Sequence, residues 1–378
     1  MRRIASILIT IVVLLLTLGI VMLASTSSTR ATAFHQDPYY FVKRQFLWLL
    51  LSVAVGAVLV RFDYHHWRKG AIPVAATALG LLVAVLIPGI GQRIGGSRRW
   101  IRVAGLSFQP SEFAKIAVVM ALSCWLAHIG PGTRRLFRGL ILPVAGIGLA
   151  AGLLIMEPDF GTTLLVGAVG MTILFVAGVR IGYLAVTAAV GAGVFVIAVL
   201  RDPVRLARVL GFLMPGRYPA TSYHLDQSKR AFMQGGFGGV GLGQSIQKEW
   251  YLPEAHTDFI LAIVGEELGF LFTLAVVLLF FGLLVCGMVI SLRAPDLFGQ
   301  LLGFGITVMI VLQAAINTGV VTGCLPTKGL PLPFISYGGS SLLASMAGIC
   351  ILLNVARHGT SEYVDPHTRP IKDVVHSG

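Results

Sequence analysis

Charged residues are scarce in this sequence. Asp, Glu, Lys and Arg make up 12% of its 378 residues, whereas 56% are hydrophobic and the mean hydropathy is +0.85. Soluble globular domains carry about 25% charged residues, so this composition excludes a soluble protein of this length. It indicates an integral membrane protein.

Cysteine is also scarce, and it is not spaced for metal binding. Three of the four cysteines lie in apolar runs and one just after such a run: Cys124, Cys286, Cys324 and Cys350. Because no Cys-x-x-Cys or Cys/His pattern is present, the sequence favours neither a structural zinc site nor a disulfide framework. We interpret the cysteines as small core residues.

Long apolar runs recur along the whole chain. A membrane-spanning helix needs about 17–25 residues, so we predict an all-α polytopic membrane protein with about ten transmembrane helices. The first run is too long for the apolar part of a signal peptide, and we interpret it as a retained first helix. The runs are Ile4–Ala24, Phe46–Val60, Ala71–Ile87, Phe113–Ile129, Leu140–Met156, Thr162–Gly178, Ile181–Leu200, Leu268–Leu292, Phe298–Val321 and Leu342–Ala356.

Loop charge predicts the orientation. Ten spans place both termini on one side, and the loops of that side carry more Lys and Arg than the short loops of the other, which predicts cytoplasmic termini. Residues 1–357 would then form a single integral membrane domain, followed by a short cytoplasmic tail, 358–378. The longest loop, 201–257, would lie outside, between the seventh and eighth spans.

Basic residues outnumber acidic ones, with 29 Lys and Arg against 16 Asp and Glu and a formal net charge of +13. In a soluble protein this excess would suggest nucleic acid, but here the basic residues lie between membrane spans and no nucleic-acid-binding signature is present. The expected partners are anionic membrane lipids and phosphate-bearing substrates. Most acids also fall on the external side, where four short polar motifs gather.

The first motif is GGSRRWIRVAGLSFQPSEFAKI, residues 95–116. Trp100 suits a membrane interface. Glu112 and Lys115 fall on one face of a predicted helix, where they either contact substrate or simply form an ion pair. The arginines beside Trp100 are candidates to bind phosphate: Arg98, Arg99 and Arg102.

The second motif is EPDFGTT, residues 157–163, a tight external turn between two spans. Asp159 is a candidate for substrate binding. It also suits the N-cap of the following helix, and the sequence leaves both roles open.

The third motif, LPEAHTDF followed by ILAIVGEELGF, enters a membrane helix at residues 252–270. Thr257 or Asp258 is expected to cap this helix. Asp258 would then lie at the membrane surface, with Glu266 and Glu267 about two turns deeper. Acids inside a membrane are functional candidates because the bilayer penalises them, although these two glutamates could instead pair with neighbouring helices.

The fourth motif is LPTKGLPLPFISYGGSS, residues 325–341. Its prolines and glycines prevent a regular helix. Irregular backbone at membrane depth is tolerated where it is buried in protein or lines a wet cavity, so we predict a re-entrant loop at about 325–337. Lys328 in this loop could contact an anionic headgroup.

Together the motifs resemble the SEDS family, the bacterial shape, elongation, division and sporulation proteins. The matching stretches are GGSRRWI, QPSEFAK, EPDFGTT, GLGQSIQKEWYLPEAHTDFILAIVGEELG and INTGVVTGCLPTKGLPLPFISYGGSS, in this order. The LPTKG form resembles the cell-division branch, FtsW. The resemblance implies ten helices and a glycosyltransferase that polymerises lipid II outside the membrane, with inversion and loss of undecaprenyl pyrophosphate. It also implies a class B penicillin-binding protein and other division proteins as partners at the septum.

The resemblance assigns the family's essential acid to Asp258, which we predict to be the general base. Glu254 is a geometrically plausible alternative that sits further into the external loop. A departing pyrophosphate needs positive charge, which Arg98, Arg102, Lys115 and Lys328 could supply, with a divalent cation such as Mg²⁺ or Mn²⁺ as a further option. The remaining candidates for substrate binding are Trp100, Glu112, Asp159, Lys248, His256, Glu266, Glu267 and Ser336.

Two other functions fit the sequence. A lipid II flippase would explain the spans and polar groups, but it predicts ionisable residues near the bilayer midplane and on both sides. A non-catalytic division scaffold would only bind and activate its partner. A substitution of Asp258 that abolishes function but leaves complex assembly intact would exclude the scaffold.

Overall fold

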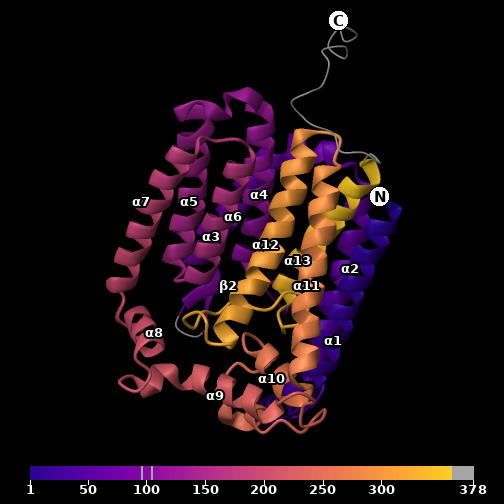
Figure 1. The fold of residues 1–378 in the computed structure, drawn as a ribbon, viewed down its shortest axis with the longest axis vertical. Coiled ribbons are helices and arrows are strands. Elements are labelled where there is room, and N and C mark those ends of the chain that lie inside the picture. The colour runs from indigo at the N-terminus through magenta and orange to yellow at the C-terminus, as the bar shows by residue number, and fades with distance from the viewer. Residues whose placement is uncertain (95–96, 104, 360–378) are drawn as a thin grey trace, which may run out of the picture.

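The structure is a computed structural model that describes residues 1–94, 97–103 and 105–359. Long helices form an upright bundle, and shorter helices lie across one end of it (Figure 1). Within the described residues, nine helices are long and apolar enough to cross a membrane, and α6 (Phe160–Val176) is a shorter apolar helix. The predicted all-α polytopic membrane fold is therefore confirmed. The nine are α1 (Arg2–His35), α2 (Tyr40–Arg61), α3 (Tyr64–Leu86), α4 (Pro110–Ile129), α5 (Leu142–Met156), α7 (Ile181–Leu200), α11 (Gly269–Leu292), α12 (Leu297–Val321) and α13 (Gly339–His358).

The start of α1 and the end of α13 lie at the same end of the bundle. The side chain of Met1 lies against Gly359, directly after α13. The short helices cover the opposite end, which the sequence predicts to be external (Figure 1).

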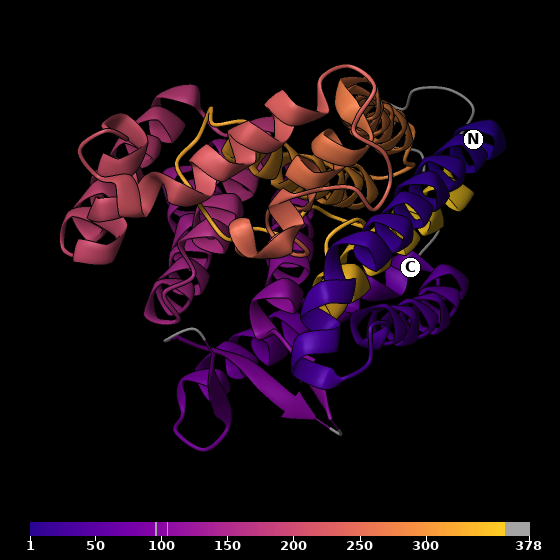
Figure 2. The same ribbon diagram turned by 90° about the horizontal axis from the view of Figure 1, so that it is seen from below.

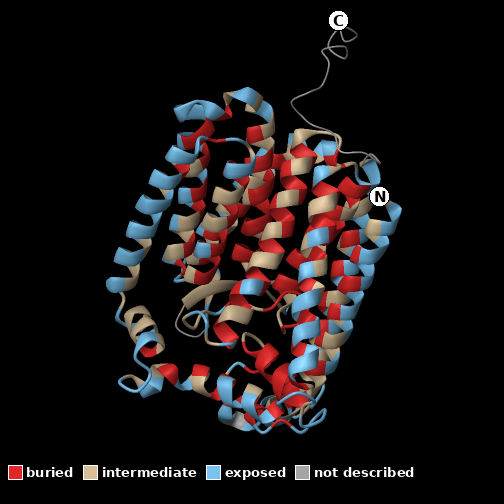
Figure 3. Ribbon diagram, viewed as in Figure 1, coloured by how far each residue is buried: buried red, intermediate tan, exposed pale blue. Residues whose placement is uncertain are grey.

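The last two long helices form the centre of the bundle. In their apolar stretches 78% of α13 and 61% of α12 is buried, against 6% of α7, which stands at the edge (Figure 3). The α7 helix packs mainly on α6, on α8 (Pro203–Leu213) and on a helical turn at Leu136–Ile141. The region of α7 and α8 is thus a lightly packed flank beside a dense core.

A small antiparallel sheet before α4 was not predicted. Strands β1 (Gly91–Ile94), β2 (Ser97–Val103) and β3 (Leu106–Phe108) pair in the order β1-β2-β3, with Trp100 opposite Gln92. Gly105, with a φ of +79°, lies between β2 and β3, where a left-handed residue favours glycine. The sheet lies on one edge of the molecule in the view from below (Figure 2).

The long external segment folds into helices rather than an extended loop. It contains α8, α9 (Pro219–Gly235) and a short helical turn at Gln247–Tyr251, and these elements cross the external end of the bundle (Figures 1 and 2). Asp202 starts α8 by accepting hydrogen bonds from the backbone N–H groups of Val204 and Arg205. The segment thereby brings α8 beside the site described below.

The helix after Asp258 is broken, which corrects the predicted depth of Glu266 and Glu267. Helix α10 runs only from Ile260 to Glu267, and no side chain caps its start, so the predicted cap by Thr257 or Asp258 is wrong. Gly269 then turns the chain into α11 with a φ of +79°, and a side chain there would meet the backbone of Gly239 at 2.4 Å. Both glutamates consequently contact the external segment instead of lying two turns deeper in the membrane.

Candidate active site

The loop between α12 and α13 is fastened to the turn that carries Asp258. Asn317 on α12 donates from its side-chain amide to the carbonyl oxygens of Asp258, at 2.8 Å, and Leu330, at 2.7 Å. The Ser336 hydroxyl donates to the carbonyl of Thr257 at 2.6 Å and accepts from the N–H of Leu332 at 2.8 Å. Ser336 was predicted to bind substrate. The structure uses its hydroxyl to join these two segments.

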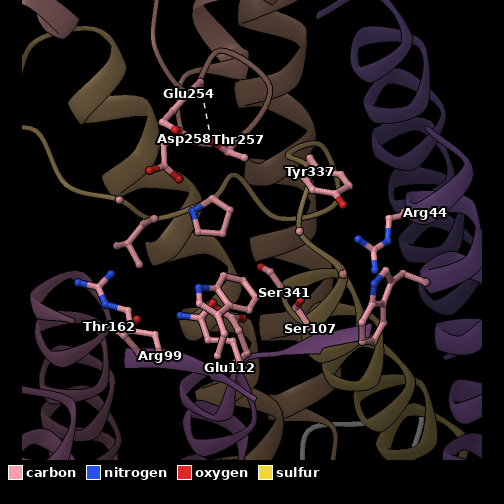
Figure 4. Close-up of a pocket in the computed structure, with 18 residues that line it drawn as sticks. Arg44, Arg99, Ser107, Glu112, Thr162, Glu254, Thr257, Asp258, Tyr337 and Ser341 are labelled. Carbon is pink, nitrogen blue, oxygen red and sulfur yellow. Dashed lines mark hydrogen bonds between the residues drawn. The ribbon is translucent and has the colours of Figure 1, made fainter. Parts of the chain in front are cut away.

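Two cavities meet at Asp258, and we name each after a basic residue found in it alone. The Arg44 cavity, of about 370 Å³, lies between α2, the sheet, α4 and the α12–α13 loop (Figure 4). The Lys328 cavity, of about 860 Å³, lies between the start of α6, helices α8 and α9 and the same loop. Both are lined by Arg99, Trp100, Glu254, Asp258 and Gly329.

The Asp258 carboxyl group has an ionisation suited to a general base. Burial raises its pKa to about 7, and the negative charges of Glu254 and Asp159 add to this increase, while Arg99 and Arg208 oppose it. One carboxylate oxygen lies so close to Gly329 that a side chain at that position would meet it at 2.9 Å. A base with a pKa near the working pH combines the right protonation state with sufficient basicity.

Glu254, the alternative base, is more exposed than Asp258. It lines both cavities, and its carboxylate accepts a hydrogen bond from the Thr257 hydroxyl at 2.8 Å. Its backbone has a φ of +56°, which is rare for a residue with a side chain. This sharp turn directs the chain towards Asp258.

The structure separates the predicted phosphate-binding arginines. Arg99 lines both cavities and donates to the backbone carbonyls of Glu157, at 3.0 Å, and Pro158. Arg98 donates to the carbonyl of Leu86 at 3.4 Å, and neither Arg98 nor Arg102 lines either cavity. The choice of these two as pyrophosphate contacts is therefore not supported, and Arg99 takes their place.

Three further basic residues line the Lys328 cavity. Lys328 lies 5.1 Å from the ring of Phe195 on α7, and burial lowers its pKa. Arg205 and Arg208 come from α8, where Arg205 forms a 3.0 Å ion pair with Asp202. Neither arginine was among the predicted site residues, because residues 201–257 were predicted to be a loop. The Asp202-Pro203 pair, a frequent helix start, was the available signal.

Lys115 cannot meet a pyrophosphate in this arrangement. Its ammonium group forms a 2.9 Å ion pair with Glu112 and donates to the Gln313 side chain at 2.7 Å, and both charged side chains are almost fully buried. Gln313 in turn donates to the carbonyl of Pro331. The pair thus supports the loop, although Glu112 also borders the Arg44 cavity.

Asp159 is occupied as the N-cap of α6. Its carboxylate accepts from the N–H and the hydroxyl of Thr162, at 3.2 and 2.9 Å, and from Ser111. Neighbouring Glu157 is fully buried, and neither of its carboxylate oxygens has a hydrogen-bond partner. Burial and the charge of Asp159 raise the pKa of Glu157 to about 8, so this acid is mostly neutral at pH 7.

The remaining candidates line neither cavity. Glu267 pairs with Lys248 at 2.8 Å and accepts from the Ser25 hydroxyl at 2.7 Å, while Glu266 accepts from the N–H of Ile246 at 2.9 Å. His256 packs between Phe41 and Tyr337, with ring centroids 5.0 and 6.0 Å away. Burial lowers its pKa to about 4, so it is neutral at pH 7.

The fold and the site define a polytopic membrane protein with a cation-lined acidic centre at the end of the bundle opposite its N-terminus. The chain belongs to the FtsW/RodA/SpoVE family of cell cycle proteins, whose model matches residues 5–361.

Related proteins share this fold along almost the whole chain. The chain is 43% identical to a probable peptidoglycan glycosyltransferase FtsW of Trichlorobacter lovleyi, covering 93% of this chain and 92% of the relative. It is also 43% identical to stage V sporulation protein E of Bacillus subtilis, covering 93% and 96%. The crystal structure of Thermus thermophilus rod shape determining protein RodA superposes with a TM-score of 0.69, at 26% identity, over 94% of this chain and 97% of RodA. A chain from a peptidoglycan synthase complex that coordinates polymerization and crosslinking gives a TM-score of 0.73 at 29% identity, over 93% and 96%.

Proposed function

We propose that this protein is a peptidoglycan glycosyltransferase that polymerises lipid II into glycan strands at the outer face of the cytoplasmic membrane. Its role would be septal wall synthesis during cell division. The observation that carries the proposal is Asp258, whose pKa is raised to about 7 at the junction of two cavities lined by basic residues. The family membership and the names of the relatives agree with this activity.

Asp258 acts as the general base in this reaction. Its carboxylate takes the proton of the acceptor's sugar hydroxyl, and the hydroxyl oxygen forms a bond to the anomeric carbon of the donor. The bond from that carbon to the diphosphate oxygen breaks on the opposite face, and the diphosphate leaves with the electron pair. The anomeric configuration is therefore inverted.

Basic residues of the Lys328 cavity stabilise the departing diphosphate. Arg99, Arg208 and Lys328 line the cavity that also contains Asp258, and within the described residues none of the three forms an ion pair with a carboxylate. Their positive charge meets the negative charge that develops on the leaving group, which is where fixed electrostatic stabilisation is most effective.

A divalent cation at this site would need ligands from the substrate as well as from the protein. Among the described residues, no group of three or more His, Cys, Asp or Glu side chains could hold a metal ion. Mg²⁺ is commonly bound by one or two carboxylates together with substrate phosphates, and Glu254 and Asp258 would serve as those carboxylates. When bound, the cation would add positive charge beside the diphosphate.

The partners we propose are lipid II, the nascent glycan strand, a class B penicillin-binding protein and other division proteins. Both termini would be cytoplasmic in a protein of the bacterial inner membrane, concentrated at the septum. The likeness to a chain of a peptidoglycan synthase complex supports the transpeptidase partner. The larger number of Lys and Arg residues in the loops on the side of the termini supports the orientation.

The distribution of polar residues favours a polymerase over a flippase. The cavities at Asp258 lie towards the end of the bundle opposite the N-terminus, which we propose to be external, whereas a transporter would need its binding site near the midplane with alternating access. The buried Glu112–Lys115 pair lies in the first two turns of α4, and its charges compensate each other.

The test is polymerisation of lipid II by the purified protein, with and without the cognate transpeptidase. Glycan strands should form with the wild-type chain and with Asp37→Asn, a control on an external acid that lines neither cavity. Asp258→Asn should form none. Translocation of lipid II without polymerisation by the wild-type complex would favour the flippase, and assembly of an inactive wild-type complex would favour the scaffold.

A further inference from the structure

We propose that the two cavities have fixed and different roles. The Lys328 cavity binds the glycosyl donor through the diphosphate that will leave, and the Arg44 cavity binds the acceptor, whose own diphosphate contacts Arg44. This inference rests on the proposed function, since it assigns the two lipid-linked substrates of that reaction to two parts of one site.

The chemistry fixes where each diphosphate must lie. In the donor, the diphosphate is attached to the carbon under attack, so it must lie close to the general base. In the acceptor, the attacking hydroxyl and the diphosphate are at opposite ends of the disaccharide. A cation near Asp258 therefore marks the donor, and a cation one disaccharide away marks the acceptor.

The cations near Asp258 belong to the Lys328 cavity. The charges of Arg99 and Arg208 act on the Asp258 carboxyl, whereas the Lys328 ammonium lies 5.1 Å from the ring of Phe195 and is not among the charges that act on it. Arg208 and Lys328 line only this cavity. Glu254 and Asp258 line both cavities. The cations of the Lys328 cavity therefore lie on the side of these acids where the donor's anomeric carbon must be placed.

Arg44 lies away from Asp258. In the close-up of the cavity, Arg44 on α2 and Asp258 are on opposite sides, with Tyr337 between them (Figure 4). Arg44 acts electrostatically on the Tyr337 phenol and does not appear among the charges that act on Asp258. This separation is what an elongated acceptor requires.

The Arg44 guanidinium has only neutral partners among the described residues. It donates to the Tyr40 hydroxyl at 2.8 Å and to the carbonyl of Gly105. A half-buried cation that faces a cavity without a carboxylate partner is suited to an anionic ligand. The same cavity is also lined by aromatic, hydroxyl and amide groups, which suit a sugar: Trp48, Trp100, Ser107, Gln109, Tyr337 and Ser341.

The test separates the two substrates with lipid II analogues that can each play only one role. A donor-only analogue carries hydrogen in place of the attacking hydroxyl. An acceptor-only analogue has a methylene group in place of the oxygen between the anomeric carbon and the diphosphate, so it keeps the charge but cannot transfer its sugar. Their coupling forms one bond, and the KM of each is measured with the other saturating.

Opposite effects are expected in two matched variants. Arg44→Gln should raise the KM of the acceptor-only analogue about ten- to hundredfold and leave that of the donor-only analogue within about twofold, because a charged hydrogen bond contributes about 1.5–3 kcal/mol. Arg208→Gln should raise the KM of the donor-only analogue instead. Arg44→Lys, which keeps the charge, should recover part of the lost acceptor affinity.

A second acceptor, with an uncharged linker in place of the diphosphate, tests whether Arg44 acts on that charge. Wild type and Arg44→Gln should then have the same KM for it, whereas a merely structural role at the Gly105 turn would impair both acceptors equally. Equal effects of Arg44→Gln on both analogues, or the reverse pattern, would overturn the assignment. Failure of the wild-type protein to couple the analogues, while it also fails to polymerise lipid II, would instead refute the proposed function.

Discussion

The carboxylates at the two ends of α10 differ in their surroundings: those at its end have partners within the protein, and the one before its start faces two cavities. Glu266 and Glu267 at its end are 1% exposed, Lys248 forms an ion pair with Glu267, and the carboxylate oxygens accept hydrogen bonds from Ser25, Ser245, Ile246 and Gln247. Asp258, just before its start, faces two cavities and has a pKa raised to about 7. The comparison shows that an acid at the membrane edge is a functional candidate only when no ion pair or set of hydrogen bonds within the protein already satisfies its carboxylate.

Replacing the uncompensated acid should have the largest effect on activity. Asp258→Asn keeps the shape of the side chain but removes its ability to accept a proton, so the polymerisation rate should fall about 10²–10⁴-fold or more. The thermal unfolding temperature in detergent should not fall. A carboxyl group whose pKa is raised in the folded protein does not stabilise the fold when it ionises. Polymerisation within tenfold of wild type would contradict the general-base role.

Breaking the compensated pair should affect stability instead. Lys248→Met leaves the Glu267 carboxylate buried without its cation, which typically costs about 3–5 kcal/mol. Denaturant unfolding in detergent should show this loss, while the folded fraction polymerises lipid II at the normal rate. Lys248→Met combined with Glu267→Leu should recover much of the stability. A stable but inactive Lys248→Met variant would place Lys248 in the site after all.

Two adjacent arginines of β2 provide a narrower contrast. Arg99→Gln removes a cation from both cavities and should lower kcat/KM about ten- to hundredfold, as expected for a charged hydrogen bond. Arg98→Gln changes a residue that lines neither cavity and should stay within about twofold. Initial rates at limiting lipid II measure both. Similar losses in the two variants would mean that the charge of the whole strand matters, rather than the contact made by Arg99.

The spans were predictable because hydropathy depends on local sequence, and Asp258 was a candidate because its motif matches the family. Hydropathy identifies a membrane helix without tertiary information, and the α12–α13 loop follows from its prolines and glycines. The break between α10 and α11 was missed because one glycine, Gly269 in EELGF, does not end a helix by itself. Gly269 does so here because it packs against Gly239 of the external segment, 30 residues earlier in the chain.

The choice among charged residues depended on tertiary partners that a sequence does not show. Lys115 and Lys328 look equally available in their motifs, yet only Lys328 lines a cavity that also contains Asp258, while Lys115 pairs with Glu112. Arg98 and Arg99 differ by one position on a short strand that hydropathy does not detect. Only the folded structure shows that Arg99 lines both cavities, whereas Arg98 donates to the carbonyl of Leu86.

The smallest expected effect is a change in pH dependence. Asp258 must be ionised to accept a proton, and its pKa is raised to about 7, so kcat/KM should rise as the pH increases through that value. Histidines do not explain such a profile, because burial lowers the pKa of His224 and sets that of His256 at about 4. Glu254 contributes to the raised pKa through its negative charge. Glu254→Gln removes this charge and thereby lowers the pKa of Asp258. The rise of kcat/KM on the acid side of the pH profile, its acid limb, should move to lower pH.

The control for this shift is Asp37→Asn, whose carboxylate pairs with Lys43 and does not act on Asp258. Its acid limb should coincide with that of wild type. A limb that stays in place in Glu254→Gln, or moves to higher pH, would show that Glu254 does not act on the base. If Glu254→Gln instead abolished the limb and the activity together, Glu254 would be the base. Asp258 would then lie beside the reacting groups without accepting the proton.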